Sequence, residues 1–106
     1  LLSLTPEMAE LFTRAQTEYD LLTLAEHFRW RRWVNSELNI WEHAFHSLSN
    51  GTLGDAMWVG YDVSYRALYC NDSAHRISRE IETFYGTDFR EHVNRTTAEE
   101  CEETSL

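Results

Sequence analysis

Hydrophobic residues recur along most of this chain at the three- and four-residue intervals that are typical of amphipathic helices. The clearest stripe runs through Trp30, Val34, Leu38, Trp41, Phe45 and Leu48. This spacing keeps the side chains on one face of a single helix. Thr23 and Glu26 have the spacing of a capping box, and Asn50-Gly51 is a typical helix end. The pattern therefore predicts one long helix over residues 24–49.

Shorter stripes on either side predict the remaining elements of an all-α fold, a small antiparallel helical bundle. Thr5 precedes Pro6, which is a typical start of a helix. Clusters of Gly, Asn, Asp and Ser separate the later stripes. The predicted main helices cover residues 6–16, 24–49, 55–70 and 73–85, and a short helical turn covers residues 88–94. The link between the second and third helices is short, so we expect these two to be antiparallel neighbours.

The length of the chain predicts a single domain followed by a tail. At 106 residues there is room for one core, which we expect within residues 1–95. After Arg95 the sequence is acidic and lacks large apolar side chains. Residues 96–106 are therefore expected to form a disordered, solvated tail rather than an acidic recognition segment or a calcium site.

The overall charge excludes a general nucleic-acid binder. The formal net charge is −9, whereas binding to phosphate backbones needs an excess of Lys or Arg. Apolar residues make up 42% of the chain, which is enough to build a core. There is no run of about 18 apolar residues, so we do not expect the chain itself to span a membrane. Because the chain begins Leu1-Leu2-Ser3 without an initiator methionine, we expect an upstream segment that could include an anchor or a signal.

The sequence contains no motif that specifies a reaction. It has no Gly-rich phosphate loop, and no serine or cysteine nucleophile has a visible base beside it. A small hydrolase assembled across helices is therefore the least favoured function, and no cofactor is predicted. Cys70 and Cys101 lie far apart without CxxC spacing. We favour two free thiols in a reducing compartment, while a disulfide between them stays open.

The segment Phe28-Arg29-Trp30-Arg31-Arg32-Trp33 is the strongest candidate for a binding surface. Three arginines between aromatic residues form a local positive patch in an acidic chain. Such a patch contacts anionic lipid, a phosphate group or an acidic protein. In the competing interpretation, Trp30 packs inward and the stems of the arginines cover apolar surface along the outer faces. The predicted contact residues for a partner or an anion are Arg29, Arg31, Arg32 and Trp33.

Glu42, His43 and His46 are the candidate metal ligands. On a helix, Glu42 and His46 share a face, and the two histidines are also neighbours. Two imidazoles and a carboxylate can begin a metal site. Further ligands would have to come from outside this segment, from His27, His75 or His92. A di-iron site of the ferritin type needs further glutamates and a second Glu-x-x-His on facing helices. No predicted helix has a Glu three residues before a His, and the helix predicted over 55–70 has no Glu, so a polar helix face with solvated histidines is favoured.

Several short motifs follow one another over most of the chain. They are Pro6-Glu7-Met8-Ala9-Glu10-Leu11-Phe12, Ile40-Trp41-Glu42-His43-Ala44-Phe45 leading into Asn50-Gly51-Thr52-Leu53, Trp58-Val59-Gly60-Tyr61, and Tyr85-Gly86-Thr87-Asp88-Phe89-Arg90-Glu91-His92-Val93. In their order and spacing, the chain resembles a family of uncharacterised bacterial proteins. Members share a short helical domain that usually follows a single N-terminal transmembrane helix. Relatives tend to have an aromatic-Glu-Asn pair followed by tyrosines where this chain has Trp41-Glu42-His43 and Phe45-His46, which weakens the metal interpretation.

The resemblance implies a domain tethered at the cytoplasmic face of a bacterial inner membrane, or a cytoplasmic one, and it transfers no activity. With no catalytic constellation in the sequence, it favours a non-catalytic interaction or regulatory module over an enzyme. The expected contact is a protein partner or self-association through an aromatic face. The alternative function is a metal- or cofactor-binding helical bundle that uses Glu42, His43 and His46.

Overall fold

The computed structural model describes residues 5–104, with side chains as far as Cys101, and this part of the chain is all-α. Its elements are α1 (Pro6–Thr17), η1 (Tyr19–Leu21), α2 (Leu24–Ser49), α3 (Asp55–Leu68), α4 (Asp72–Ile81), η2 (Glu82–Phe84) and α5 (Thr87–Thr104), where η marks a short 3₁₀ helix. The all-α prediction is confirmed. The count differs, because the described residues form five α-helices rather than four main helices and a turn.

The predicted long helix, α2, begins and ends where the sequence pattern indicates. The Thr23 hydroxyl accepts a hydrogen bond from the Glu26 amide at 3.1 Å, and the Thr23 amide donates to the Glu26 carboxylate at 2.9 Å. These two bonds satisfy backbone donors that would otherwise lack partners at the helix start. Just after the helix, Gly51 has a φ of 82°, which only glycine adopts without steric cost.

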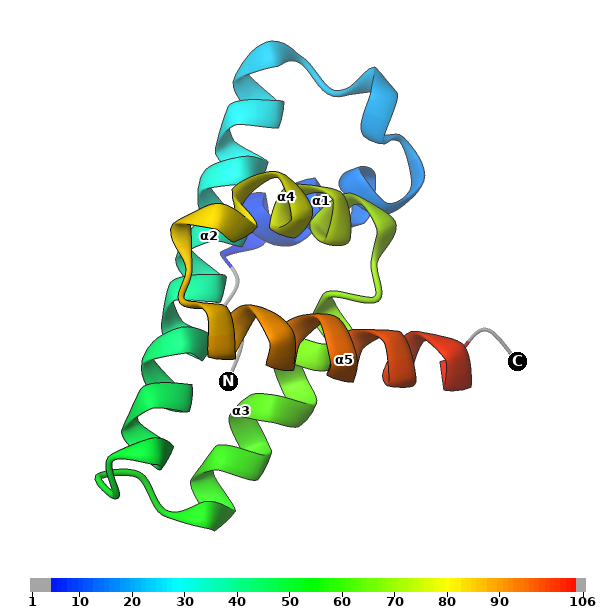
Figure 1. Ribbon diagram of the computed structural model, residues 1–106. Helices are drawn as coiled ribbons and strands as arrows, with labels where there is room; N and C mark the ends of the chain where they lie inside the picture. The colour runs from blue at the N-terminus through cyan, green and yellow to red at the C-terminus, as the bar shows by residue number, and fades with distance from the viewer. Residues whose placement is uncertain (1–4, 105–106) are drawn as a thin grey trace.

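The helix α2 is the central element against which α1, α3 and α4 pack. Figure 1 shows α3 returning beside the second half of α2, while α1 and α4 lie together near its first half. The last helix, α5, packs on α3 and crosses it at a steep angle (Figure 1). The short link after α2 therefore makes α2 and α3 antiparallel neighbours, as expected from its length.

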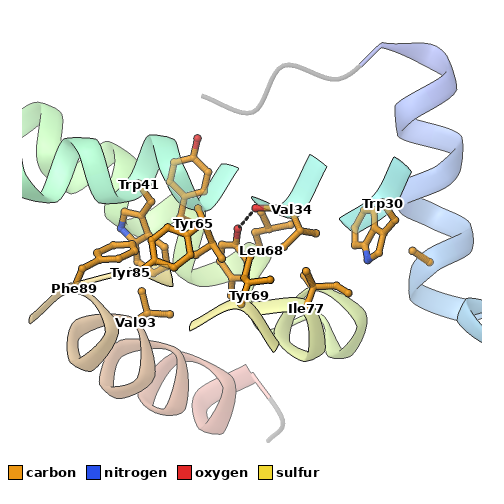
Figure 2. Close-up of a cluster of buried hydrophobic side chains, with 14 of the residues drawn as sticks. Trp30, Val34, Trp41, Tyr65, Leu68, Tyr69, Ile77, Tyr85, Phe89 and Val93 are labelled. Atoms are coloured by element: carbon orange, nitrogen blue, oxygen red, sulfur yellow. Dashed lines mark hydrogen bonds between the residues drawn. The ribbon is translucent and has the colours of Figure 1, made fainter. Parts of the chain in front are cut away.

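The largest part of the core forms around Trp41, which is fully buried on α2 (Figure 2). Its ring lies nearly parallel to those of Tyr65 and Tyr69, at centroid distances of 5.8 and 5.7 Å. Phe89 of α5 meets the same indole edge-on at 5.5 Å. Such offset and edge-on pairs add stabilisation beyond the burial of area. One aromatic side chain thus joins three helices.

The last helix is longer than the sequence pattern predicts. We expected a turn over 88–94 and a disordered tail over 96–106, but α5 continues to Thr104. Of the predicted tail, residues 105 and 106 lie outside the described residues. Two observations explain the difference. Thr96 and Thr97 are buried, and their hydroxyls donate to the carbonyls of His92 at 2.8 Å and Val93 at 2.6 Å. The residues that follow are mainly Ala and Glu, which favour helix.

A disulfide between Cys70 and Cys101 corrects the expectation of two free thiols. It joins the residues just after α3 to the last turns of α5, with 5.2 Å between the two Cα atoms. The cysteines are 31 residues apart in sequence. Their proximity depends on how α5 crosses α3, and no local motif announces that crossing. The bridge fixes the part of α5 that has few apolar side chains of its own.

Replacing both cysteines (Cys70→Ser with Cys101→Ser) should lower the free energy of unfolding by about 2–4 kcal/mol, because the bridge restricts the unfolded chain. Urea unfolding measures this loss. Amide hydrogen exchange should also become faster in α5 after Thr97. A reducing agent should reproduce both effects in the wild-type chain and have none in the double variant. Two titratable thiols in the purified wild-type protein would contradict the assignment.

Candidate functional site

The first half of α2 carries the four predicted contact residues, but the structure gives them different roles. Arg31 is engaged in an ion pair with Glu80 of α4. Trp33 is half-buried and packs on Trp30, with 5.3 Å between ring centroids. Trp33 also meets the Phe12 ring of α1 edge-on at 5.8 Å, so both residues take part in packing one helix against another. Arg31 and Trp33 contribute less to a free binding surface than the sequence pattern suggests.

Arg29 and Arg32 remain exposed on α2. Within the described residues, neither guanidinium forms an ion pair with a carboxylate. The Arg32 guanidinium carbon lies 5.8 Å from the centroid of the Phe28 ring, within the range of a cation–π contact. These two arginines are the part of the predicted basic patch that is free to meet an external anion.

Large hydrophobic side chains surround these arginines, and the helical stripe did not predict their exposure. Leu24 is 89% exposed, Phe28 is 63% exposed, and Phe84 of η2 is 80% exposed. Leu24 and Phe28 are four residues apart on α2, so they share a face. We call the surface formed by Leu24, Phe28, Arg29, Arg32 and Phe84 the Phe28 face. It combines unpaired positive charge with exposed apolar area.

Two shallow depressions flank Phe28. One, of about 540 Å³, is lined by Met8 and by residues of α2 that include Arg29 and Trp33. The other, of about 230 Å³, brings Phe28 and Arg32 together with Phe84. Phe28 and Arg32 line both depressions, so they form the ridge between them. The Phe28 face is therefore a ridge with apolar and cationic sides.

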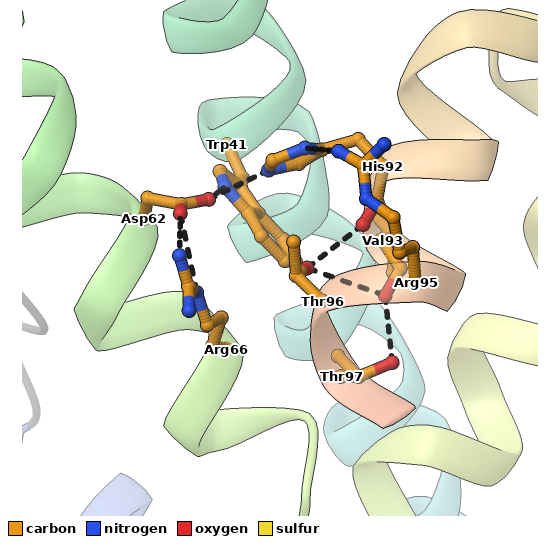
Figure 3. Close-up of polar contacts among 8 residues, drawn as sticks. All are labelled: Trp41, Asp62, Arg66, His92, Val93, Arg95, Thr96 and Thr97. Carbon is orange, nitrogen blue, oxygen red and sulfur yellow. Dashed lines mark hydrogen bonds and ion pairs between the residues drawn. The ribbon is translucent and has the colours of Figure 1, made fainter. Parts of the chain in front are cut away.

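A polar cluster, separate from the Phe28 face, lies between α2, α3 and α5 (Figure 3). The sequence pattern does not predict it. Asp62 is buried on α3 and accepts hydrogen bonds from side chains of three elements. The Trp41 indole N–H donates to Asp62 Oδ1 at 3.3 Å, and His92 Nε2 lies 2.7 Å from the same oxygen. Arg66 donates to Asp62 Oδ2 from Nε at 3.1 Å and from Nη2 at 2.5 Å.

The hydrogen bonds of this cluster determine its electrostatics. Burial alone raises the pKa of Asp62, but hydrogen bonds from Arg66 and His92 outweigh it, so the net pKa is lowered. The same hydrogen bond, which Arg66 donates to Asp62, raises the pKa of Arg66. An Arg95 nitrogen lies 3.3 Å from His92 Nδ1. Since arginine only donates, Nδ1 accepts there, and the His92 proton is assigned to Nε2, facing Asp62.

The His92 imidazole is surrounded by aromatic rings. The rings of Phe45, Trp58 and Trp41 lie at centroid distances of 5.3, 5.4 and 5.9 Å from its imidazole. Both ring nitrogens face charged groups of the protein. A histidine in a hydrolytic triad would present its second nitrogen to a serine or cysteine, and here that nitrogen faces Arg95. The cluster is therefore arranged to hold α5 against α2 and α3.

The structure brings together only two of the three candidate metal ligands. Glu42 Oε2 lies 3.8 Å from His46 Nε2, and it also accepts a hydrogen bond from the Gly86 amide at 3.2 Å. His43 faces elsewhere, where it lines a depression with Thr52. Within the described part of the chain, no three His, Cys, Asp or Glu side chains gather as metal ligands would. Glu42 thus helps position the start of α5.

The two regions described above cannot be compared with those of a known relative. No family model, curated protein or solved structure matches the chain. The resemblance to the bacterial family therefore stays a prediction from the motifs. Among the helices that the structure describes, none is both long enough and apolar enough to cross a bilayer.

The variant Asp62→Asn should lower the free energy of unfolding by about 1–3 kcal/mol, because the amide loses the charge-assisted bonds to Arg66 and His92. The folded pKa of Asp62 is depressed, so its contribution is complete above the ordinary carboxyl pKa. It disappears as the pH falls through the lowered folded value. The difference between wild type and variant in urea unfolding should therefore shrink on acidification.

The matched control for this variant is Glu91→Gln, which also neutralises a carboxylate. Glu91 is exposed on α5, and no hydrogen bond or ion pair of its side chain occurs among the described residues. We expect a change within about 0.5 kcal/mol there. Equal stability losses for the two variants would show that Asp62 does not hold the three helices together.

Proposed function

We propose that this chain is a non-catalytic interaction module whose binding surface is the Phe28 face. The observation that carries the proposal is the combination of two unpaired arginines with exposed Leu24 and Phe28 on one helix. Single exposed apolar side chains are normal in soluble proteins. Several of them together, bordered by charged groups, are typical of an interaction site. The partner therefore presents an anionic surface with apolar parts.

The polar cluster supports a role without catalysis. Asp62 is surrounded by internal donors, and His92 has both ring nitrogens engaged. A catalytic acid or base has to reach a substrate proton directly or through one water molecule. Asp62 and Arg66, whose pKa values are shifted by their mutual hydrogen bonds, are instead committed to holding helices together. Arg29 and Arg32, in contrast, are exposed on α2 and form no ion pair with a carboxylate of the described residues.

A photo-crosslinking amino acid at position 28 tests this proposal. The residue p-benzoylphenylalanine would replace Phe28, and cells that express the chain would be irradiated. We expect adducts with protein, with lipid or with a second copy, any of which identifies a contact. Changing Arg29→Glu together with Arg32→Glu should lower the adduct yield about tenfold or more, because like charges then face the partner.

The matched control is the same crosslinking residue at position 57. Met57 lies on α3 and is 61% exposed, close to the 63% of Phe28. The two positions thus offer equal access to chance collisions, but position 57 is not part of the Phe28 face. Equal adduct yields at positions 28 and 57 would refute the proposal.

We extend the proposal to the location of the module. The motif resemblance supports tethering at a bacterial inner membrane. The Cys70–Cys101 disulfide supports the oxidising side of that membrane, because structural disulfides are rare in a reducing cytosol. The cytoplasmic side, which the resemblance favours, stays a competing prediction. Thiol trapping in intact cells decides between them: we expect an oxidised pair, whereas two reduced thiols would favour the cytoplasm.

A further inference from the structure

We propose that the partner of the Phe28 face is the surface of an anionic lipid bilayer. Leu24 and Phe28 would enter the boundary between headgroups and acyl chains, while Arg29 and Arg32 contact lipid phosphates. The inference rests on the proposed function, because it names the partner of that surface. It depends on two properties of the surface, its shape and its local charge.

The shape of the face suits a deformable planar surface. Leu24, at 89% exposed, lines neither of the depressions beside Phe28, and Phe84, at 80% exposed, projects from η2 next to α2. Phe28 forms the ridge between the two shallow depressions and Phe84 borders one of them, so these apolar side chains protrude beside open hollows and do not line an enclosed pocket. Protein partners usually anchor on enclosed, well-packed pockets. The headgroup region of a bilayer accommodates protruding apolar side chains without a complementary cavity.

The local charge of the face is positive even though the whole chain is acidic. Glu26 of α2 is paired with Arg14, and Glu80 of α4 is paired with Arg31. Neither Arg29 nor Arg32 forms an ion pair with a carboxylate of the described residues. Figure 1 shows that α5, which carries the acidic C-terminal segment, points away from α2 to the other side of the molecule.

A second exposed apolar surface shows why the arginines matter. Met57, Val59 and Val63 on α3 are each more than half exposed. The arginine of that helix, Arg66, is held by Asp62 and is not free to contact phosphate. Apolar exposure alone therefore does not distinguish the two surfaces. The pairing of exposed apolar side chains with unpaired guanidinium groups occurs on the Phe28 face, and this pairing is what an anionic bilayer recognises.

Co-sedimentation with vesicles tests the inference directly. The purified chain would be mixed with vesicles of phosphatidylcholine alone or of phosphatidylcholine with phosphatidylglycerol. We expect binding only to the anionic vesicles, and loss of binding at about 1 M NaCl, where exposed charges are screened. Absence of binding to anionic vesicles at low salt would overturn the inference.

Two sets of variants connect this binding to the Phe28 face. Arg29→Gln with Arg32→Gln should weaken partitioning about 30-fold, roughly fivefold for each arginine. Phe28→Ser should weaken it about tenfold or more, because the ring no longer leaves water. The matched controls are Arg79→Gln with Arg90→Gln, and Met57→Ser, which should bind like wild type. Controls that lose as much binding as the test variants would overturn the assignment to this face.

The vesicle result can fail separately from the proposed function. Crosslinks from position 28 to a protein, without vesicle binding, would preserve the interaction module and replace the bilayer by an acidic protein partner. Vesicle binding that needs Phe28, Arg29 and Arg32 supports the bilayer. Neither crosslinks nor vesicle binding would remove both proposals. Circular dichroism of each variant confirms that the helices are intact, which we expect because all substituted side chains of the face are exposed.

Discussion

The packing of Trp41 is the interaction on which the rest of this structure depends. Its indole contacts Tyr65 of α3, Tyr69 just after that helix, and Phe89 of α5. One side chain of α2 thus determines the position of both helices. Because burial removes its N–H from water, a hydrogen-bond partner for that group stabilises the fold. Asp62 supplies that partner at 3.3 Å. Trp41 thus belongs to the apolar core through its ring and to the polar cluster through its N–H.

The carboxylate that satisfies Trp41 brings a further requirement. A buried negative charge is stable only when other groups compensate it. Arg66 supplies the opposite charge from the next turn of α3, and His92 of α5 adds a hydrogen bond to the carboxylate. This explains why α5 has a defined position although few of its side chains are apolar. The Thr96 and Thr97 hydroxyl bonds and the Cys70–Cys101 bridge then continue the attachment along the helix.

The sequence was sufficient to predict what depends on local rules. Apolar spacing and the Thr23–Glu26 capping box gave the bounds of α2, because both act within a few residues. The length of α5 and the disulfide depend on contacts between segments that are distant in sequence. Asp62 and His92 are 30 residues apart, so no spacing rule connects them. Arg29 and Arg32 were predicted as contact residues, but the roles of Arg31 and Trp33 required knowing that α1 and α4 lie beside them.

The same reasoning explains why the Phe28 face is separable from the fold. The buried stripe of α2 starts at Trp30, so Leu24 and Phe28 lie before and beside it, where no other helix covers them. Their hydrophobic character contributes little to the core, and solubility alone would favour polar residues there. Arg29 and Arg32 likewise form no ion pair that stabilises the described residues. A surface that the fold does not need, yet that keeps apolar and cationic groups together, supports the proposed contact with a partner outside the chain.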